Sequence, residues 1–350
     1  MPVGPNVAET PRFARFRKFT ETLFYILLLC LVYPITFDQT ERTFQTYLRN
    51  FNKSYENEEV YRQKFEAFKE SLRRIDELNS YMKDGSIVYG LTKYSDMSPE
   101  EFSSSKLVYK RPFQPIESLS KRSLNELKFS KFNNLPLKVD LREKNYVSEV
   151  LTQGSCGACW AFSVIGIIES TKALQDGNLT KLSIQQMIDC SYYNFGCTGG
   201  DICSLLDWLV TYNIEITTEE AYPLKLRTEP CNPPRSNRTT KLRSYDCRSF
   251  VQREQLMLHH VATRGPLAVG INAESWQHYI GGTIQYHCSN VASSLNHAVQ
   301  IIGYDLTAPV PYYIVKNSWG EDFGEKGYLK VAVGRNLCGL AHEVASVRVL

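Results

Sequence analysis

Two cysteines, Cys156 and Cys159, lie three positions apart in the stretch QGSCGACW, and several kinds of chemistry use such a pair. The pair could ligate a metal, act as a redox couple, form disulfides or contain a nucleophile. A structural zinc site needs a second pair of Cys or His ligands at short spacing, and none follows. A thioredoxin-like redox pair needs a βαβ context, which the flanking sequence lacks. Disulfide formation and nucleophilic chemistry remain.

Cys159 stands at the start of an apolar stretch, CWAFSVIGIIESTKAL, which predicts a buried helix that ends at residues 176–178. The positive end of a helix dipole favours the thiolate form of a cysteine. A cysteine nucleophile also needs a base, and the base needs an orienting group. His297 begins a predicted strand in SLNHAVQIIGY, and KNSWG offers Asn317 to hold an imidazole and Trp319 to shield that hydrogen bond. Spacing alone leaves His297 as either a base or a structural histidine.

The elements that must position these residues change character along the chain. Beyond about residue 130, helical patterns come first: the stretch after Cys159, then SIQQMIDC and ICSLLDWLV. After about residue 265 the pattern changes to short β-rich runs, PLAVGI, HAVQIIGY, YYIVK, GYLKVAV and VASVRVL. A helical half followed by a strand half indicates an α+β architecture with a cleft between the halves.

The N-terminal third is distinct, because no cysteine lies between Cys30 and Cys156. The spacing of apolar residues predicts a helix over residues 44–79, and Ser98 could cap a second helix that begins at SPEEF. A polar stretch rich in Ser and Lys, residues 118–131, is typical of a linker. The net charge of the whole chain is +3, too small to indicate a nucleic-acid partner.

Residues 1–37 have the pattern of a secretory signal. A basic lead precedes the apolar run from Leu23 to Tyr33, which is shorter than the roughly 20 residues that a transmembrane helix needs. An uncleaved membrane anchor is the alternative. Removal of the signal would take Cys30 with it and leave an odd number of the ten cysteines. In an oxidising compartment, one thiol then has no disulfide partner.

Four motifs occur in the same order as in a known family: QGSCGACW, SIQQMIDC with GCTGG, LNHAVQIIGY and KNSWG. Over about residues 135–350 the chain thereby resembles the papain-like cysteine peptidases. The resemblance implies an α+β fold of two domains, a helical left domain and a β-barrel-like right domain, with the active-site cleft between them. It also implies a helical inhibitory propeptide. We therefore expect a signal over residues 1–37, a propeptide over 38–130 and a mature peptidase domain over 131–350.

The resemblance assigns different roles to the two cysteines. Cys159 would be the nucleophile, and Gln153 would form the oxyanion hole with the Cys159 backbone N–H. His297 would be the general base and acid, Asn317 would orient it, and Trp319 would cover the pair. The cysteine and histidine would rest as thiolate and imidazolium. The family uses no metal and no cofactor.

The remaining cysteines are also assigned by the resemblance. The family pairs are Cys156–Cys197, Cys190–Cys231 and Cys288–Cys338. Cys203 and Cys247 lie outside that common set and are left as a fourth pair, with two buried free thiols as the alternative.

The propeptide motifs depart from the family in several positions. Phe68, Ile75 and Asn79 keep the spacing of the family's helix motif, but Ser71 replaces an Asn. The next motif is present as Gly90, Thr92, Tyr94 and Asp96, with Thr and Tyr replacing Asn and Phe. Such a segment would run back-to-front through the cleft and block it. Leu141, near the start of the mature domain, replaces a Trp and predicts a change in packing.

Specificity is expected to depend on the pocket for the side chain two residues before the scissile bond. Glu343 would lie at its base and Asp201 on its wall, where two carboxylates would favour a basic side chain. The alternative is a solvated Glu343 that points outward. Gly199 and Gly200 would let an extended substrate backbone approach closely. The short segment between Cys197 and Cys231 has no room for a carboxypeptidase loop, so endopeptidase action is expected.

The expected partners are protein and peptide substrates, the chain's own propeptide as inhibitor, and cystatin-like inhibitors, with the protein as a monomer. Sequons at Asn52, Asn178 and Asn237 predict glycosylation. For a chain with this resemblance, glycosylation implies delivery to the lysosome, with secretion as the alternative. A second function would be a catalytically silent binding or inhibitor protein on the same fold. The presence of every residue assigned to the active site argues against it.

Overall fold

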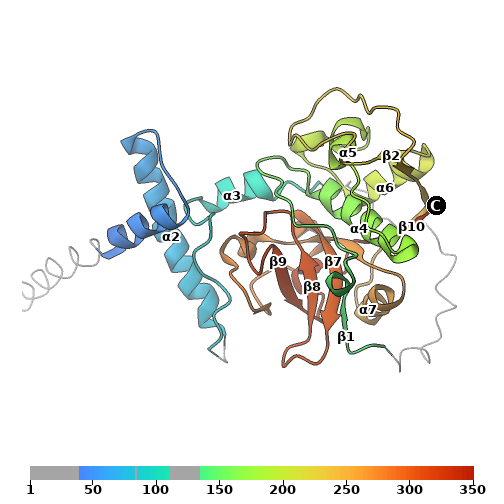
Figure 1. The fold of residues 1–350 in the computed structure, drawn as a ribbon. Helices are drawn as coiled ribbons and strands as arrows, with labels where there is room; N and C mark the ends of the chain where they lie inside the picture. The colour runs from blue at the N-terminus through green and yellow to red at the C-terminus, as the bar shows by residue number, and fades with distance from the viewer. Residues whose placement is uncertain (1–38, 83–84, 111–134) are drawn as a thin grey trace, which may run out of the picture. The chain divides into compact units, whose positions relative to one another are not determined.

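The computed structural model describes residues 39–82, 85–110 and 135–350, and the chain forms two compact units, residues 1–69 and 70–350 (Figure 1). The expected secretory signal over residues 1–37 and the linker over 118–131 lie outside the described residues. Among the described helices, none has the length and apolar character needed to cross a bilayer.

The first unit is built on aromatic packing. Residues 39–50 are helical and α2 (Glu58–Ser80) begins in this unit, so the helix expected over residues 44–79 is interrupted at residues 51–57. The Phe44 ring lies 4.9 Å from that of Phe68 and 5.2 Å from that of Phe65, and Tyr47 lies 5.0 Å from Phe68. These rings form a small core between the two helical segments.

The second unit begins within α2 and continues through α3 (Pro99–Lys106). The Ser98 hydroxyl accepts a hydrogen bond from the Glu101 N–H at 3.2 Å, so the expected cap is confirmed. The main helices beyond residue 135 are α4 (Cys159–Asp176), α5 (Ile184–Cys190), α6 (Ile202–Thr211) and α7 (Glu254–Thr263). Gly177, with φ +76°, ends α4 in the left-handed conformation that favours glycine.

Short 3₁₀ turns connect these elements: η2 (Leu141–Lys144), η3 (Gly196–Thr198), η4 (Glu274–His278), η5 (Ala292–Ser294) and η6 (Leu337–Gly339). Leu141 is buried in η2, where it packs in place of the larger side chain that the family pattern has.

One sheet dominates the second unit. Its strands are β1 (Lys138–Asp140), β4 (Leu242–Arg248), β5 (Leu267–Ile271), β6 (Thr283–Ile284), β7 (His297–Asp305), β8 (Tyr312–Lys316), β9 (Tyr328–Ala332) and β10 (Val344–Val349). The order is β4-β10-β5-β7-β8-β9-β6, with β1 paired to β7, and only the β6–β9 pair is parallel. The path stays open, so the sheet is not a closed barrel. Strands β2 (Ile216–Thr217) and β3 (Thr239–Thr240) form a separate small sheet.

The core has two parts, and neighbouring residues of β5, β7 and β10 contribute to one part or the other. One part gathers apolar residues of α4, α5 and α6, and the other covers the central strands of the sheet. Helix α4 packs against β7, the strand whose nine residues are all buried (Figure 1). The helical half and the strand half expected from the sequence are therefore both present, and the contact between α4 and β7 joins them.

Candidate active site

Helix α4 and strand β7 each begin with a residue expected to do chemistry. Cys159 is the first residue of α4, and His297 is the first residue of β7. The backbone N–H of Ala298 lies close enough to the Cys159 thiol to act on its pKa, so the sulfur lies beside the start of β7. The structure thus brings together two residues that are far apart in the sequence.

A close approach between backbone and side chain fixes the two elements to each other. The Gln300 amide nitrogen, on β7, donates to the Gly166 carbonyl oxygen of α4 at 2.9 Å. A Cβ atom at position 166 would lie 2.5 Å from the Gln300 Oε1. A larger residue at position 166 would therefore displace the end of the Gln300 side chain. The hydrogen bond from Gln300 to Gly166 ties α4, which begins with Cys159, to β7, which begins with His297.

The imidazole of His297 is oriented by Asn317. Its Nε2 lies 2.8 Å from the Asn317 Oδ1, and this oxygen also accepts the Ser318 N–H at 2.8 Å. The Trp319 ring covers the imidazole, with centroids 4.8 Å apart and planes 34° apart. The other ring nitrogen, Nδ1, is buried and has no hydrogen-bond partner among the described residues. That nitrogen is available to exchange a proton.

Three hydrogen bonds fix the position of Gln153. Its Oε1 accepts a hydrogen bond from the Ser318 hydroxyl at 2.6 Å, and its Nε2 donates to the Cys156 carbonyl oxygen at 3.1 Å. Its backbone N–H donates to the Ser318 carbonyl oxygen at 2.8 Å. One N–H of the amide is left to donate to another acceptor. The sequence analysis did not single out Ser318, although its place between Asn317 and Trp319 in KNSWG was a usable signal.

The segment that follows α3 covers this site. The Tyr109 N–H donates to the Asn296 carbonyl oxygen at 3.1 Å, and the Lys110 N–H donates to the Gly200 carbonyl oxygen at 3.0 Å. Tyr109 pairs with Gly200 in parallel orientation. The Lys106 ammonium donates to the carbonyl oxygen of Gly154, one residue after Gln153. Gly199 and Gly200 therefore contact the backbone of residues 108–110, and their contact with a substrate backbone stays a prediction.

Burial under this segment changes the protonation of the two reactive groups. It raises the pKa of the Cys159 thiol to about 12, although the backbone N–H groups of Ala298, Trp160 and Cys159 act in the opposite direction. It lowers the pKa of His297 to about 4, and the Asn317 bond only partly offsets this. Desolvation therefore disfavours both charged forms in this covered state. The thiolate–imidazolium pair stays a prediction for the uncovered site.

The Tyr109 side chain is buried beside two acidic residues. The Tyr109 hydroxyl donates to the Asp201 Oδ2 at 3.0 Å, and the other oxygen of Asp201 caps α6 through the Ser204 N–H at 2.6 Å. Glu343 is only 1% exposed. Burial first, and then the charges of Asp201 and Glu343, raise the pKa of Tyr109 well above its ordinary value. Both acidic residues therefore lie near Tyr109, and Glu343 is buried in this structure rather than solvated.

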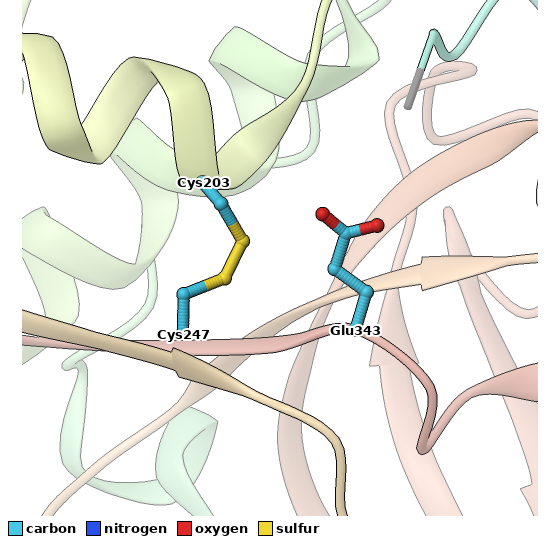
Figure 2. A group of neighbouring side chains, drawn as sticks. All are labelled: Cys203, Cys247 and Glu343. Carbon is cyan, nitrogen blue, oxygen red and sulfur yellow. A yellow bond between two sulfur atoms is a disulfide. The ribbon is translucent and has the colours of Figure 1, made fainter. Parts of the chain in front are cut away.

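Glu343 lies beside a disulfide. Its carboxylate oxygen and the sulfurs of Cys203 and Cys247 lie within 4.8 Å of one another, and Figure 2 shows the carboxylate directed toward the bridge. Cys203 comes from α6 and Cys247 from β4. Both sulfurs are bonded to each other, so they offer no thiolate to a metal.

The described residues contain four disulfides and one free cysteine, Cys159. The disulfides are the four pairs named above: Cys156–Cys197, Cys190–Cys231, Cys203–Cys247 and Cys288–Cys338. The asparagines of the three sequons, Asn52, Asn178 and Asn237, are exposed.

The motif residues before residue 100 form specific contacts. Asn79 accepts the N–H groups of Val88 and Tyr89 at 3.2 and 3.1 Å. The Thr92 hydroxyl donates to the Gln277 carbonyl oxygen at 2.6 Å. The Tyr94 ring meets the Trp319 ring edge-on at 5.9 Å. The residues at positions 92 and 94 therefore contact the part of the second unit that lies beyond residue 135.

Comparisons with known proteins agree with this geometry. Residues 135–348 match the papain family cysteine proteases, and residues 44–102 match the cathepsin propeptide inhibitor domain. Cathepsin O of Homo sapiens is 41% identical over 285 residues, which cover 80% of this chain and 86% of the relative. Cathepsin O of Mus musculus is 39% identical over 80% of this chain and 88% of its own length. The solved structure of digestive procathepsin L2 from the Tenebrio molitor larval midgut is similar with a TM-score of 0.78 and 29% identity, covering 88% of this chain and 99% of that one.

Proposed function

Because this chain belongs to the papain family of cysteine proteases and carries that family's propeptide domain, we propose that it is the inactive precursor of an endopeptidase that acts in the lysosome. The observation that carries the proposal is the arrangement of Cys159, His297 and Asn317 beneath a propeptide segment. The substrates are proteins and peptides. No metal and no cofactor takes part in the steps proposed below.

The reaction follows from the residues around the free thiol. Once the covering segment leaves, the Cys159 proton passes to His297 Nδ1, and the thiolate attacks a peptide carbonyl carbon. The resulting oxyanion accepts hydrogen bonds from the Cys159 backbone N–H and from the Gln153 amide. His297 then gives its proton to the leaving amine, and water hydrolyses the acyl-enzyme. Asn317 holds the imidazole in the orientation that both transfers need.

The propeptide segment keeps the precursor inactive by two effects. The Tyr109 side chain fills a substrate pocket, which excludes peptides. The same segment removes water from Cys159 and His297, so the ion pair that starts the reaction does not form. Loss of the segment would reverse both effects at once.

The acidic pocket supports a preference for basic side chains two residues before the scissile bond. The Tyr109 hydroxyl already donates a hydrogen bond to Asp201 inside it. A guanidinium or ammonium group could donate to Asp201 and Glu343 together, and hydrogen bonds between charged groups are stronger than those between neutral ones. An Arg or Lys side chain of a substrate would therefore bind at the place of the Tyr109 side chain, and more tightly than Tyr109 does.

Cellular delivery is also part of the proposal. We assign residues 1–37 to a secretory signal, 38–130 to the propeptide and 131–350 to the mature enzyme, which would be a monomer and a target of cystatin-like inhibitors. Exposed sequons at Asn52, Asn178 and Asn237 support passage through the secretory pathway. Secretion is the alternative destination. Loss of lysosomal co-fractionation after Gln replacement of all three asparagines would support glycan-dependent delivery.

The test is to label the acid-matured protein with an epoxide that alkylates cysteine thiolates, and to locate the label by mass spectrometry. We expect modification of Cys159 alone and its loss in the His297→Ala variant. The Cys159→Ser variant controls for labelling elsewhere. A folded, processed sample that takes up no label and cleaves no peptide would overturn the proposal and favour a catalytically silent binding protein.

A further inference from the structure

Three side chains with metal-binding atoms converge near Tyr109, and the function proposed above uses only one of them. They are Cys203, Cys247 and Glu343, and all three are buried. The two Sγ atoms and one carboxylate oxygen of Glu343 lie within 4.8 Å of one another. Figure 2 shows the carboxylate directed toward the bridge that joins the two sulfurs. The two sulfurs and the oxygen are the kinds of atom that proteins use to bind zinc.

Strand pairing places two of these residues on one face of the sheet. In the antiparallel pair of β4 and β10, Cys247 lies opposite Ala345. Glu343 precedes Ala345 by two positions, and side chains two positions apart in an extended chain point to the same side. The strand pairing continues as far as Glu343, whose carbonyl oxygen accepts the Gly270 N–H of β5 at 3.0 Å. Cys247 and Glu343 are therefore diagonal neighbours on this face.

The third ligand comes from the first turn of α6. Cys203 is the second residue of this ten-residue helix, whose N-terminal cap is Asp201. The positive end of the helix dipole favours the thiolate over the thiol, and the thiolate is the form that binds metals and exchanges with disulfides. The Cα atoms of Cys203 and Cys247 are 6.0 Å apart. The helix and the strand thus hold both cysteines close enough for their sulfurs to reach one ion.

In the precursor, the Tyr109 side chain lies over this group. A Cβ atom built on Gly270 would lie 3.3 Å from the Tyr109 ring and 3.5 Å from the Glu343 carboxylate, so both side chains pack at the same point of the backbone. Tyr109 also belongs to the same buried cluster as Cys203 and Cys247. Departure of the covering segment would therefore open a path to the three ligands.

The bridge must open before its sulfurs can bind a metal, and a small thiol such as free cysteine is the reductant that this step needs. One thiol molecule, as the thiolate, attacks a sulfur of the bridge, forms a mixed disulfide and releases the other cysteine. A second thiol molecule attacks the small-molecule sulfur of the mixed disulfide, which releases the second cysteine and forms the oxidised small-molecule disulfide. Two electrons pass to the bridge, and the protons of the two small thiols end on the two cysteines.

We propose that, after this reduction, Cys203, Cys247 and Glu343 bind a zinc ion. Zinc binds thiolates at about 2.3 Å and carboxylate oxygens at about 2.1 Å, and a tetrahedral arrangement then places the ligand atoms about 3.6–3.8 Å apart. The three atoms already lie within 4.8 Å of one another, so rotations of the side chains bring them to this geometry. Binding releases the protons of the two thiols, and water takes the fourth position.

Zinc at this place would change the substrate preference, and this consequence rests on the function proposed above. The ion would occupy the Glu343 carboxylate, which would then be lost to a basic substrate side chain. The ratio of kcat/KM for Arg over Leu peptides should fall when thiol and zinc are both present and return after chelation. The ratio is the readout because zinc bound to Cys159 would slow both peptides alike.

The binding test uses the full chain with the changes Cys159→Ser and Tyr109→Ala, which remove a competing thiol and open the cover. The protein equilibrates without oxygen in a cysteine/cystine buffer at about pH 7, where zinc can displace the thiol protons. A chelating buffer sets the free zinc. The exchange is stopped with acid, and the thiols are alkylated and located by mass spectrometry. The ratio of reduced to oxidised Cys203–Cys247 bridge should rise about tenfold for each tenfold increase in free zinc above the Kd, since zinc stabilises only the reduced form.

Controls separate this site from other zinc ligands. The Cys190–Cys231 bridge of the same protein is the internal control, and its ratio should not change with zinc. The Glu343→Gln variant should need at least tenfold more zinc for the same rise, since one ligand is lost. Cobalt(II) gives a second readout, because thiolate ligands produce a charge-transfer band in the near ultraviolet. The reduced protein should show this band, and the Cys203→Ser/Cys247→Ser variant should not.

Four results would overturn the proposal. These are a bridge that stays closed at every thiol concentration that keeps the fold, a ratio that does not change with zinc, an equal rise for both bridges, and the same zinc dependence in Glu343→Gln. Thermal unfolding checks the fold of each variant. Matured enzyme alkylated at Cys159 repeats the measurement without the change at Tyr109. A matured protein that cleaves no peptide would overturn the proposed function but not zinc binding, since the full-chain test needs no catalysis.

Discussion

At the scale of single residues, Glu343 has the environment most specific to this chain. It is buried at the base of a pocket, beside a disulfide that lies outside the family's common set and near the hydroxyl of Tyr109. A positively charged substrate side chain that reached this carboxylate would form a charge-assisted hydrogen bond with it.

This environment makes the substrate preference testable. In the matured enzyme, we expect Glu343→Gln to reduce the ratio of kcat/KM for peptides with Arg over Leu two residues before the scissile bond by roughly tenfold or more, since a charge-assisted hydrogen bond is lost. The same peptide pair should be cleaved with an unchanged ratio by Glu321→Gln, an exposed control. An unaltered ratio in Glu343→Gln would contradict the role given to this pocket.

Ser318 is a positioning residue, because its hydroxyl donates a hydrogen bond to the side-chain amide of Gln153. The Gln153→Ala variant should lose roughly a hundred- to a thousandfold in kcat, the usual effect of removing one oxyanion donor. Ser318→Ala leaves the amide in place but frees it to rotate, so we expect a smaller loss in kcat with little change in KM. Thr at position 318 should restore part of the rate because it keeps the hydroxyl. Equal losses in the Ala and Thr variants would argue for a packing role instead.

At the scale of elements, local patterns in the sequence predict individual helices and strands well. The extent of α4, its end at Gly177, the Ser98 cap and the β-rich runs after residue 265 are all present in the structure. The same local patterns do not predict which strands pair with one another. The pairing of β1 with β7 and the parallel pair of β6 with β9 depend on contacts between distant parts of the chain, which periodicity does not encode.

The same limit applies to the active site. The residue types and the motif order indicate Cys159, His297 and Asn317, but the neutral state of the covered pair required the structure. The neutral forms are favoured because both groups are deeply buried beneath the segment around Tyr109. The spacing of residues in the sequence does not predict how deeply they are buried. The sequence also does not predict that the Glu343 side chain points inward, because a residue at the end of a strand can face either side of the sheet.

The attachment of the covering segment should respond to acid through two buried histidines, His297 of β7 and His278 of η4. His297 has a pKa of about 4 and His278 of about 3 in this state, in each case mainly because burial disfavours the charged ring. Because both values lie below the ordinary histidine value, the covered state binds fewer protons than an open one. Its stability is therefore present above about pH 6.5 and is lost as the pH falls toward the lowered pKa values.

Hydrogen exchange of the Tyr109 and Lys110 amides measures this effect. Their protection factors in the Cys159→Ser precursor, which is expected not to process itself, should fall roughly tenfold or more between about pH 7 and about pH 4. The His278→Gln variant should show a smaller fall, because it removes one of the two groups. A protection factor that does not change with pH would contradict acid-driven opening.

At the scale of the whole molecule, one disulfide links the helical part of the second unit to its sheet. Cys203 on α6 and Cys247 on β4 are separated by 44 residues of sequence. A bridge that closes a loop of this length typically stabilises a protein by about 2–4 kcal/mol, chiefly by restricting the unfolded chain. Its two ends also support the wall of the pocket beside Glu343.

The double variant Cys203→Ala/Cys247→Ala should therefore lower the free energy of unfolding by about 2–4 kcal/mol, with a lower thermal midpoint. Because the bridge borders the acidic pocket, the matured variant should also discriminate less between Arg and Leu substrates. The Cys190→Ala/Cys231→Ala variant is the comparison, since its bridge is distant in sequence from Glu343 and should affect stability alone. A double variant as stable as the parent would show that the bridge adds nothing to the fold.

The contact between Gly166 of α4 and Gln300 of β7 has a consequence for inherited variation in this chain. Position 166 lies seven residues along the helix from Cys159, and its side chain is a single hydrogen atom. A missense change there to alanine adds one methyl group, which a substitution matrix scores as mild. It would nevertheless displace the Gln300 amide, whose hydrogen bonds to Gly166 and Ser170 tie the helix that carries the sulfur to the strand that carries the imidazole. Carriers of such an allele would make a protein with every reactive residue intact and with this tie between the two elements weakened.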